Sequence, residues 1–183
     1  MPNIDRLKKY NKIHMVGIGG VSMSGIAEIL ANWGFEVTGS NNVENENTKK
    51  LEEAGIKVII GHHADNVVGS DIVVHTAAVK EDNVELKAAK SLGIPTIERA
   101  DFLGEITRCY KDTITIAGTH GKSTTTSMVS LCFLEAGTDP SIQVGGDLFQ
   151  ISGNYKSGDS TNRKHQQQFK HVFPSYTIRD IIF

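Results

Sequence analysis

The residues most able to do chemistry lie in a loop that ends in a lysine and hydroxyl residues, Gly118-Thr119-His120-Gly121-Lys122-Ser123-Thr124. The loop follows a β-branched run and opens a helix-like segment, a setting in which backbone N–H groups surround phosphates. Lys122 would neutralise nucleotide phosphates, and the Ser123 hydroxyl would reach Mg²⁺. A lysine at a helix N-terminus opposes the helix dipole by about 0.3–1 kcal/mol, and a bound anion removes that conflict. The loop therefore predicts a phosphate site, although Ile116 stands where the general pattern requires glycine.

Another glycine loop, Gly17-Ile18-Gly19-Gly20-Val21-Ser22, also lies between a strand-like and a helix-like segment. It comes earlier in the chain and is called the first glycine loop below, and the loop at Gly118–Thr124 is called the second. Its glycines allow a tight turn and let backbone N–H groups approach a pyrophosphate at the positive end of the helix. An NAD site needs an acidic residue about 20 positions later, but the chain has Gly39-Ser40-Asn41-Asn42 there. The pattern favours a diphosphate ligand other than NAD. An NAD-dependent oxidoreductase is the weaker alternative, because it leaves the lysine loop unexplained.

Alternating strand-like and helix-like segments predict the elements that position both loops. The expected strands are 12–17, 35–39, 57–60, 71–75, 95–97, 113–117 and 141–144, and the expected helices are 22–33, 48–54, 83–92, 100–109 and 123–136. Repeated βα units predict an α/β fold. We expect a Rossmann-like parallel sheet domain at 1–110, with helices on both faces, and the start of a P-loop ATPase domain at 111–160. Residues 161–183 lack a sustained period, so we expect an atypical tail that is disordered or forms a makeshift strand and helix.

Composition narrows the function classes. The formal charge of −2 gives no reason to expect nucleic acid or an anionic membrane as a partner. No apolar run approaches the length of about 20 residues that spans a bilayer, and Cys109 and Cys132 do not form a CxxC pair. These features predict a soluble, cytoplasmic protein. The adjacent residues His62 and His63, with Asp65, form a weak metal-binding pattern, and we expect them to be exposed polar residues instead.

The two loops, about a hundred residues apart, together resemble those of the Mur ligases, a family of bacterial cell-wall synthesis. The first loop of that family reads Gly-Ile-Gly-Gly-x-x-Met-Ser-Gly, which is complete from Gly17 to Gly25. The second reads Gly-Thr-His-Gly-Lys-(Thr/Ser)-Thr-Thr, which is complete from Gly118 to Thr125. Further agreement, within a resemblance that covers about 14–158, comes from Gly39-Ser40, Thr48, Asn83 with Glu85, Gly93-Ile94-Pro95, Arg99-Ala100, and Pro140-Ser141 with Gly145-Gly146.

The resemblance implies a ligase that joins L-alanine to UDP-N-acetylmuramate through an acyl phosphate, with ATP and Mg²⁺ as cofactors. The implied UDP-sugar site comprises Gly17, Gly19, Gly20, Val21, Ser22, Ser40, Asn41 and Thr76. The implied ATP site comprises Gly118, Thr119, His120, Gly121, Lys122, Ser123 and Thr124; Lys122, Ser123 and His120 are its catalytic residues and Ser123 is its metal ligand. A loop hydrogen bond is an equally good interpretation of His120. A non-catalytic nucleotide-binding module and a sibling ligase that recycles a muramoyl tripeptide are the alternatives.

The chain departs from the family pattern at three places. Asn41 replaces the usual aspartate, and His75-Thr76-Ala77 replaces a Ser-Ser-Ala-like segment, both at the implied uridine-nucleotide site. Residues 161–183 do not resemble the family's continuation, in which an acidic segment supplies a magnesium-binding carboxylate. Family members run to about three domains. We therefore expect this chain to be the N-terminal portion of such a ligase, to lack most of the amino-acid site, and not to catalyse ligation by itself.

Overall fold

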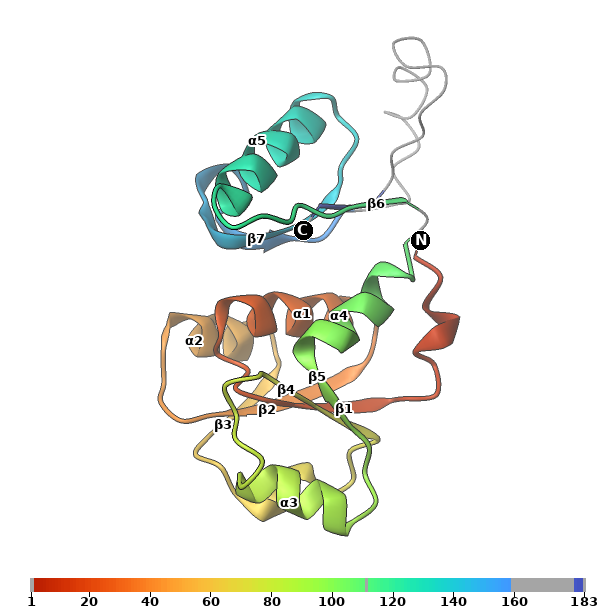
Figure 1. Cartoon of the computed structure of the whole chain (residues 1–183), viewed down its shortest axis with the longest axis vertical. Helices are drawn as coiled ribbons and strands as arrows, with labels where there is room; N and C mark the ends of the chain where they lie inside the picture. Colours follow the sequence, from red (N-terminus) through yellow and green to blue (C-terminus); the bar gives the residue numbers. More distant parts are fainter. Residues whose placement is uncertain (1, 111, 159–179, 183) are drawn as a thin grey trace. The chain divides into compact units, whose positions relative to one another are not determined.

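The predicted alternation of strands and helices forms a five-stranded parallel sheet in the order β3-β2-β1-β4-β5, which confirms the α/β class (Figure 1). The computed structural model describes residues 2–110, 112–158 and 180–182. The chain divides into two units, one of residues 4–106 and the other of residues 1–3 with 107–183. Of the predicted tail at 161–183, all but 180–182 lies outside the described residues.

The first unit contains the sheet and the helices that cover both of its faces. Its strands are β1 (Lys12–Val16), β2 (Glu36–Asn41), β3 (Lys57–Ile60), β4 (Ile72–His75) and β5 (Thr96–Glu98). Its helices are α1 (Val21–Asn32), α2 (Glu46–Glu53), α3 (Val84–Ser91) and α4 (Arg99–Thr107), with short 3-10 helices η1 (Ile4–Arg6) and η2 (Ala64–Val67). Helices α1, α2 and α4 lie on one face of the sheet, and α3 packs with η2 on the other (Figure 1).

The core of this unit follows from its most apolar elements. Strand β1 is central in the sheet and buries Ile13, Met15 and Val16 almost completely. Helix α1, predicted at 22–33, buries an apolar stripe of Met23, Ile26, Ala27, Ile29 and Leu30. Because β1 and α1 are both buried in this core, the segment that joins them must turn from the sheet into the helix that covers it. That connection is the first glycine loop.

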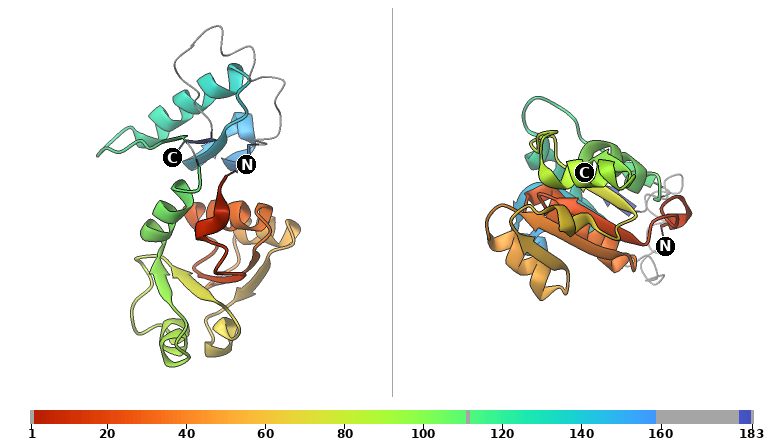
Figure 2. Two further views of the ribbon diagram at one scale, coloured as in Figure 1. Left: turned by 90° about the vertical axis from the view of Figure 1, so that its right-hand side faces the viewer. Right: turned by 90° about the horizontal axis from the view of Figure 1, so that it is seen from below.

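The second unit has the described strands β6 (Asp112–Ile114), β7 (Ser141–Leu148), β8 (Gly153–Lys156) and β9 (Asp180–Ile182), with helix α5 (Lys122–Glu135) and 3-10 helix η3 (Phe149–Ile151) (Figure 2). The sheet order is β6-β9-β7-β8, with β9 parallel to both neighbours and β8 antiparallel to β7. The predicted strand at 113–117 was wrong at its end, because β6 stops at Ile114 and the loop begins there. Strand β8 was not predicted, and β9 lies in the tail, for which a makeshift strand and helix was one of the two expectations.

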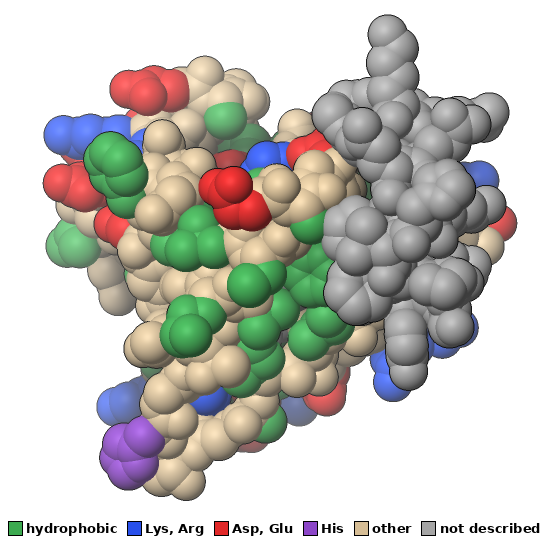
Figure 3. All heavy atoms as spheres, turned by 90° about the horizontal axis from the view of Figure 1, so that it is seen from above, with side chains coloured by type: hydrophobic (Ala, Val, Ile, Leu, Met, Phe, Trp, Pro, Cys, Tyr) green, Lys and Arg blue, Asp and Glu red, His purple; other side chains and the backbone are tan. Residues whose placement is uncertain are grey.

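Helix α5 is polar over residues 122–127 and mostly apolar over the rest of its length. It buries the small polar residues Thr126 and Ser130, whereas Met128 is 63% exposed and Cys132 is also exposed. Hydrophobic side chains reach the surface on the face that Figure 3 shows. Other apolar residues of α5 are partly buried, and Leu134 packs against the cluster of Ile142, Val144 and Leu148.

No helix among the described residues combines the length and the apolar character needed to cross a membrane.

Gly39 provides a test of how tightly the first glycine loop packs on the sheet. A Cβ atom at Gly39, in the middle of β2, would lie 2.6 Å from both the Met15 carbonyl oxygen and the Ile18 Cδ1 atom. Because one neighbour is backbone, we expect Gly39→Ala to lower the free energy of unfolding by about 1–3 kcal/mol or more. Urea denaturation measures this. The control is Gly20→Ala, whose new Cβ would meet nothing closer than 3.5 Å, and an equal loss in both variants would contradict the packing argument.

Candidate functional site

The first glycine loop is held by the end of the neighbouring strand. The carbonyl oxygen of Ser40, in β2, accepts hydrogen bonds from the amides of Gly17 at 2.8 Å and Ile18 at 3.0 Å. Gly20 then donates its amide to the carbonyl of Gly17 at 3.1 Å, which closes the turn. Gly17 has a φ of +83°, a conformation that favours glycine. The loop is thus fixed at the carboxyl edge of the sheet, where ligands of open α/β sheets bind.

Three asparagines hold the peptide groups of Gly19. The amide of Gly19 donates to Asn41 Oδ1 at 3.3 Å, and its carbonyl accepts from Asn45 Nδ2 at 3.2 Å and Asn47 Nδ2 at 2.9 Å. Asn45 also forms a capping box with Thr48 at the start of α2, which fixes its side chain. Sequence reasoning missed Asn45 and Asn47. The run of asparagines directly after the second predicted strand was the available signal.

The structure brings the predicted UDP-sugar residues to this one edge. Gly17, Gly19 and Gly20 form the loop, and Val21 and Ser22 start α1. The methyl carbon of Thr76, which follows β4, lies 3.6 Å from where a Cβ of Gly17 would stand. The hydroxyl of Ser22 accepts a hydrogen bond from Arg99 Nη1 at 3.0 Å, so α4 also contacts the start of α1. Contact of these residues with a ligand stays a prediction.

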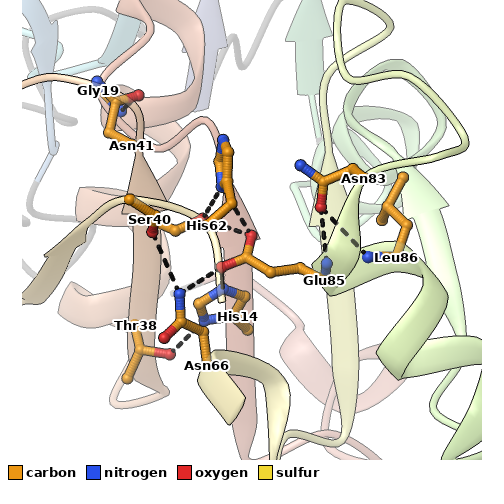
Figure 4. Close-up of polar contacts among 11 residues, drawn as sticks. His14, Gly19, Thr38, Ser40, Asn41, His62, Asn66, Asn83, Glu85 and Leu86 are labelled. Atoms are coloured by element: carbon orange, nitrogen blue, oxygen red, sulfur yellow. Dashed lines mark hydrogen bonds and ion pairs between the residues drawn. The ribbon is translucent and has the colours of Figure 1, made fainter. Parts of the chain in front are cut away.

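Beneath the loop lies a polar cluster centred on the buried carboxylate of Glu85 (Figure 4). Glu85 Oε2 accepts hydrogen bonds from Ser40 Oγ at 2.6 Å and His62 Nδ1 at 3.0 Å, and Oε1 accepts one from Asn66 Nδ2. His14 Nε2 lies 3.7 Å from Oε1 and is fully buried. These partners come from β1, β2, the residues after β3, and η2, so one carboxylate joins four segments.

Local structure places Glu85 at this centre. Asn83 caps α3 by accepting hydrogen bonds from the amides of Glu85 at 2.8 Å and Leu86 at 3.4 Å. A carboxylate in the first turn of a helix is also favoured by the helix dipole. Burial raises the pKa of Glu85, but the nearby His14 and the hydrogen bonds from Ser40 and Asn66 outweigh it and lower the pKa to about 2. The group is therefore a carboxylate at neutral pH.

The expectation of exposed histidines was wrong for His62, whose side chain is only 16% exposed and bonds Glu85. A buried partner from a distant helix cannot be read from the local sequence, which explains the error. Within the described ranges, no group of three or more His, Cys, Asp or Glu side chains is arranged to hold a metal ion. Ser40, predicted to belong to the UDP-sugar site, is fully buried, and its hydroxyl donates to Glu85.

The second glycine loop is exposed and ends at the start of a helix. Residues 117–125 are exposed, and Gly121 takes the left-handed conformation, with a φ of +76°, immediately before α5. The ammonium of Lys122 turns back over the loop and donates to the carbonyls of Gly118 at 2.6 Å and Thr119 at 3.4 Å. The lysine thus lies against the same loop that the sequence assigned to phosphate.

The start of α5 has the donors that a phosphate requires. The first amides of a helix have no partner within it, and in the described part of the chain those of Lys122, Ser123 and Thr124 donate to no other residue. Gly145, in β7, comes close to Ser123, since a Cβ there would lie 3.3 Å from the Ser123 hydroxyl. A lysine, three amides and a hydroxyl fit a nucleotide phosphate with Mg²⁺. The role of the exposed His120 stays a prediction.

Comparisons with known proteins identify the family. A family model described as "Mur ligase family, catalytic domain" matches residues 12–111, which is more than half of the chain. The chain is 53% identical to a UDP-N-acetylmuramate–L-alanine ligase of Acetivibrio thermocellus, with 83% of this chain and 32% of the relative covered. It is 47% identical to the ligase of the same name from Clostridium perfringens, with 94% and 39% covered. The chain spans about a third of the length of these curated relatives.

Solved structures agree in fold. A UDP-N-acetylmuramate-alanine ligase from Thermotoga maritima matches with a TM-score of 0.76 and 37% identity, over 80% of this chain and 35% of that protein. A UDP-N-acetylmuramate:L-alanyl-gamma-D-glutamyl-meso-diaminopimelate ligase from Neisseria meningitides matches with a TM-score of 0.77 and 27% identity, over 94% and 51%. The resemblance inferred from the two glycine loops is confirmed. The chain belongs to the Mur ligase family.

Proposed function

We propose that this chain is the N-terminal portion of an ATP-dependent ligase that joins L-alanine to UDP-N-acetylmuramate in the cytoplasm. The observation that carries the proposal is that each unit has its own glycine loop at a strand-to-helix junction, one on β1–α1 and the other before α5. A ligase of this kind needs two phosphate-binding sites, one for the nucleotide-sugar and one for ATP. The relatives that are about half identical to this chain carry the same activity in their names.

In the first unit, the diphosphate of the nucleotide-sugar would lie at the start of α1, where the helix dipole favours an anion. The amides of Gly17, Ile18 and Gly20 already donate to carbonyls of the chain, so they shape the loop. The amide of Gly19 has the longest of these bonds, at 3.3 Å to Asn41 Oδ1. A phosphate oxygen could replace that side-chain oxygen, because the Asn41 side chain can rotate away. We therefore assign Gly19 and Asn41 as the adjustable contacts of this site.

In the second unit, Lys122 would leave the carbonyls of Gly118 and Thr119 and donate to nucleotide phosphates. The amides at the start of α5 would bind the same oxygens, and Ser123 would supply a hydroxyl ligand to Mg²⁺. Such groups stabilise the charge of a phosphoryl group during transfer. We place the boundary between the two domains near residue 110, with the ATP-binding domain at 111–160.

Two other functions use the same loops. A ligase that recycles a muramoyl tripeptide shares the front end, and a structure with that type of substrate in its title matches at 27% identity. The L-alanine ligase is favoured because the solved structure named for it is 37% identical. A non-catalytic nucleotide-binding module differs from both ligases in turnover alone. We propose neither nucleic acid nor membrane as a partner.

The proposal predicts that two single substitutions affect two different ligands. Gly19→Ala places a Cβ 2.7 Å from Asn41 Nδ2, and we expect it to weaken binding of UDP-N-acetylmuramate about tenfold, which corresponds to about 1.4 kcal/mol. Lys122→Ala removes the phosphate-binding cation and should weaken ATP–Mg²⁺ at least as much. Each variant should bind the other ligand normally. Isothermal titration calorimetry measures all four combinations, with NAD as a negative control. Binding of NAD by the wild type, or loss of both ligands in either variant, would contradict the assignment.

We also expect the 183-residue chain alone to bind these ligands without completing ligation. The chain spans about a third of the relatives' length, and we assign most of the amino-acid site to the other two thirds. A coupled assay for ADP, with and without L-alanine, tests this. L-alanine-dependent ADP formation by the purified chain would show that the expectation of inactivity is wrong.

A further inference from the structure

Glu85 is fully buried, and the proposed chemistry does not use it directly. A buried charge is unfavourable unless it is paired and hydrogen-bonded. Here Ser40, His62 and Asn66 all donate to the carboxylate. Two of these donors lie next to the carboxyl edge of the sheet, since Ser40 is in β2 just before its last residue and His62 follows β3. The carboxylate therefore lies directly beneath the residues that support the first glycine loop.

Ser40 connects the carboxylate to that loop through two different atoms. Its hydroxyl donates to Glu85 Oε2 at 2.6 Å, and its backbone carbonyl accepts the amides of Gly17 and Ile18. The orientation of Ser40 therefore depends on the carboxylate, and the turn of the loop depends on Ser40. A change at Glu85 can therefore alter the turn at Gly17 through Ser40 alone.

His62 is oriented by the same carboxylate. Its Nδ1 atom lies 3.0 Å from both Glu85 Oε2 and Ser40 Oγ. The carboxylate only accepts hydrogen bonds, and the Ser40 hydroxyl gives its hydrogen to Glu85, so Nδ1 carries a hydrogen. The other ring nitrogen, Nε2, points away from Glu85 (Figure 4). Fixing Nδ1 as the donor determines what the neutral ring presents at Nε2, which is an acceptor.

We infer that Glu85 is a positioning residue of the nucleotide-sugar site, which sets the turn of the Gly17–Gly20 loop through Ser40 and the tautomer of His62. This inference rests on the proposed function for the identity of the ligand. Its effect on the loop and on the histidine can also be measured without any ligand. The two ideas can therefore fail separately.

The test compares Glu85→Gln with the matched control Glu81→Gln, an exposed glutamate just before α3. Removing a hydrogen-bonded charge should weaken UDP-N-acetylmuramate binding by about tenfold, while the control should bind as the wild type does. In the ligand-free protein, nitrogen NMR shifts of His62 should show the Nδ1–H tautomer in the wild type and a mixture in Glu85→Gln. Hydrogen exchange of the Gly17 and Ile18 amides should become faster in Glu85→Gln only.

Each result decides the inference. Unchanged affinity together with an unchanged His62 tautomer and unchanged exchange at Gly17 and Ile18 would overturn it. If the wild type does not bind the nucleotide-sugar, the proposed function fails, and the two ligand-free measurements still decide the role of Glu85. If Glu85→Gln does not fold, Ser40→Ala replaces it, because this variant removes the hydroxyl and keeps the carbonyl. Normal loop exchange and normal affinity in a folded Ser40→Ala would then overturn the inference.

The acid stability of the chain tests whether the carboxylate is charged, as the inference requires. The charged and titratable groups facing Glu85 are His14 and His62, with neutral Ser40 and Asn66. The pKa of Glu85 is lowered from 4.5 to about 2 in the folded chain, so its ionisation stabilises the fold above pH 4.5. That stabilisation is lost as the pH falls from about 4.5 towards 2. The urea midpoint should decline less over this range in Glu85→Gln than in the wild type, and equal declines would show an uncharged group.

Discussion

The buried carboxylate of Glu85 is the interaction on which the carboxyl edge of the first sheet depends. Strands of a parallel sheet are tied together by backbone hydrogen bonds along their length, but the loops beyond their ends need other contacts. Here one side chain from α3 reaches the end of β2, the residues after β3, and η2. A buried carboxylate is stable only when its hydrogen-bond donors are in place, because each missing donor leaves part of the charge without compensation. The carboxylate therefore holds Ser40 and His62 in a single geometry.

The two glycine loops differ in how many of their backbone amides already have a hydrogen-bond partner in the chain. In the first loop, the amides of Gly17 to Gly20 donate within the chain, and three asparagines hold Gly19. The loop is preorganised, so a ligand would exchange one side-chain contact for its own. In the second loop, the first amides of α5 have no partner in the described part of the chain, and the loop is exposed. A ligand at the second loop would fill these amide donors without replacing an existing contact of theirs.

Much of the fold follows from local patterns in the sequence. The strands of the first sheet and both loops were predicted close to their observed bounds, because apolar runs and glycines are local signals. The burial of Ser40 and His62 was not predicted, since it depends on Glu85, which is 45 residues from Ser40. Asn45 and Asn47 were missed for the same reason, as their partner Gly19 lies across the sheet edge. Strand β9 pairs with β6 and β7, which are far from it in the sequence, and the tail has no sustained period from which its position could be predicted.

Lys122 is the residue whose position is hardest to explain without an anionic ligand. Its charge lies at the positive end of α5, where the dipole opposes it. In the structure the ammonium turns back to the carbonyls of Gly118 and Thr119, which carry only partial negative charge. These carbonyls offset the unfavourable position incompletely, and the exposed loop gives the ammonium no ion-pair partner among the described residues. A phosphate at the same point would complement the lysine, the helix dipole and the amides of α5 at once, so one ligand accounts for three otherwise separate features.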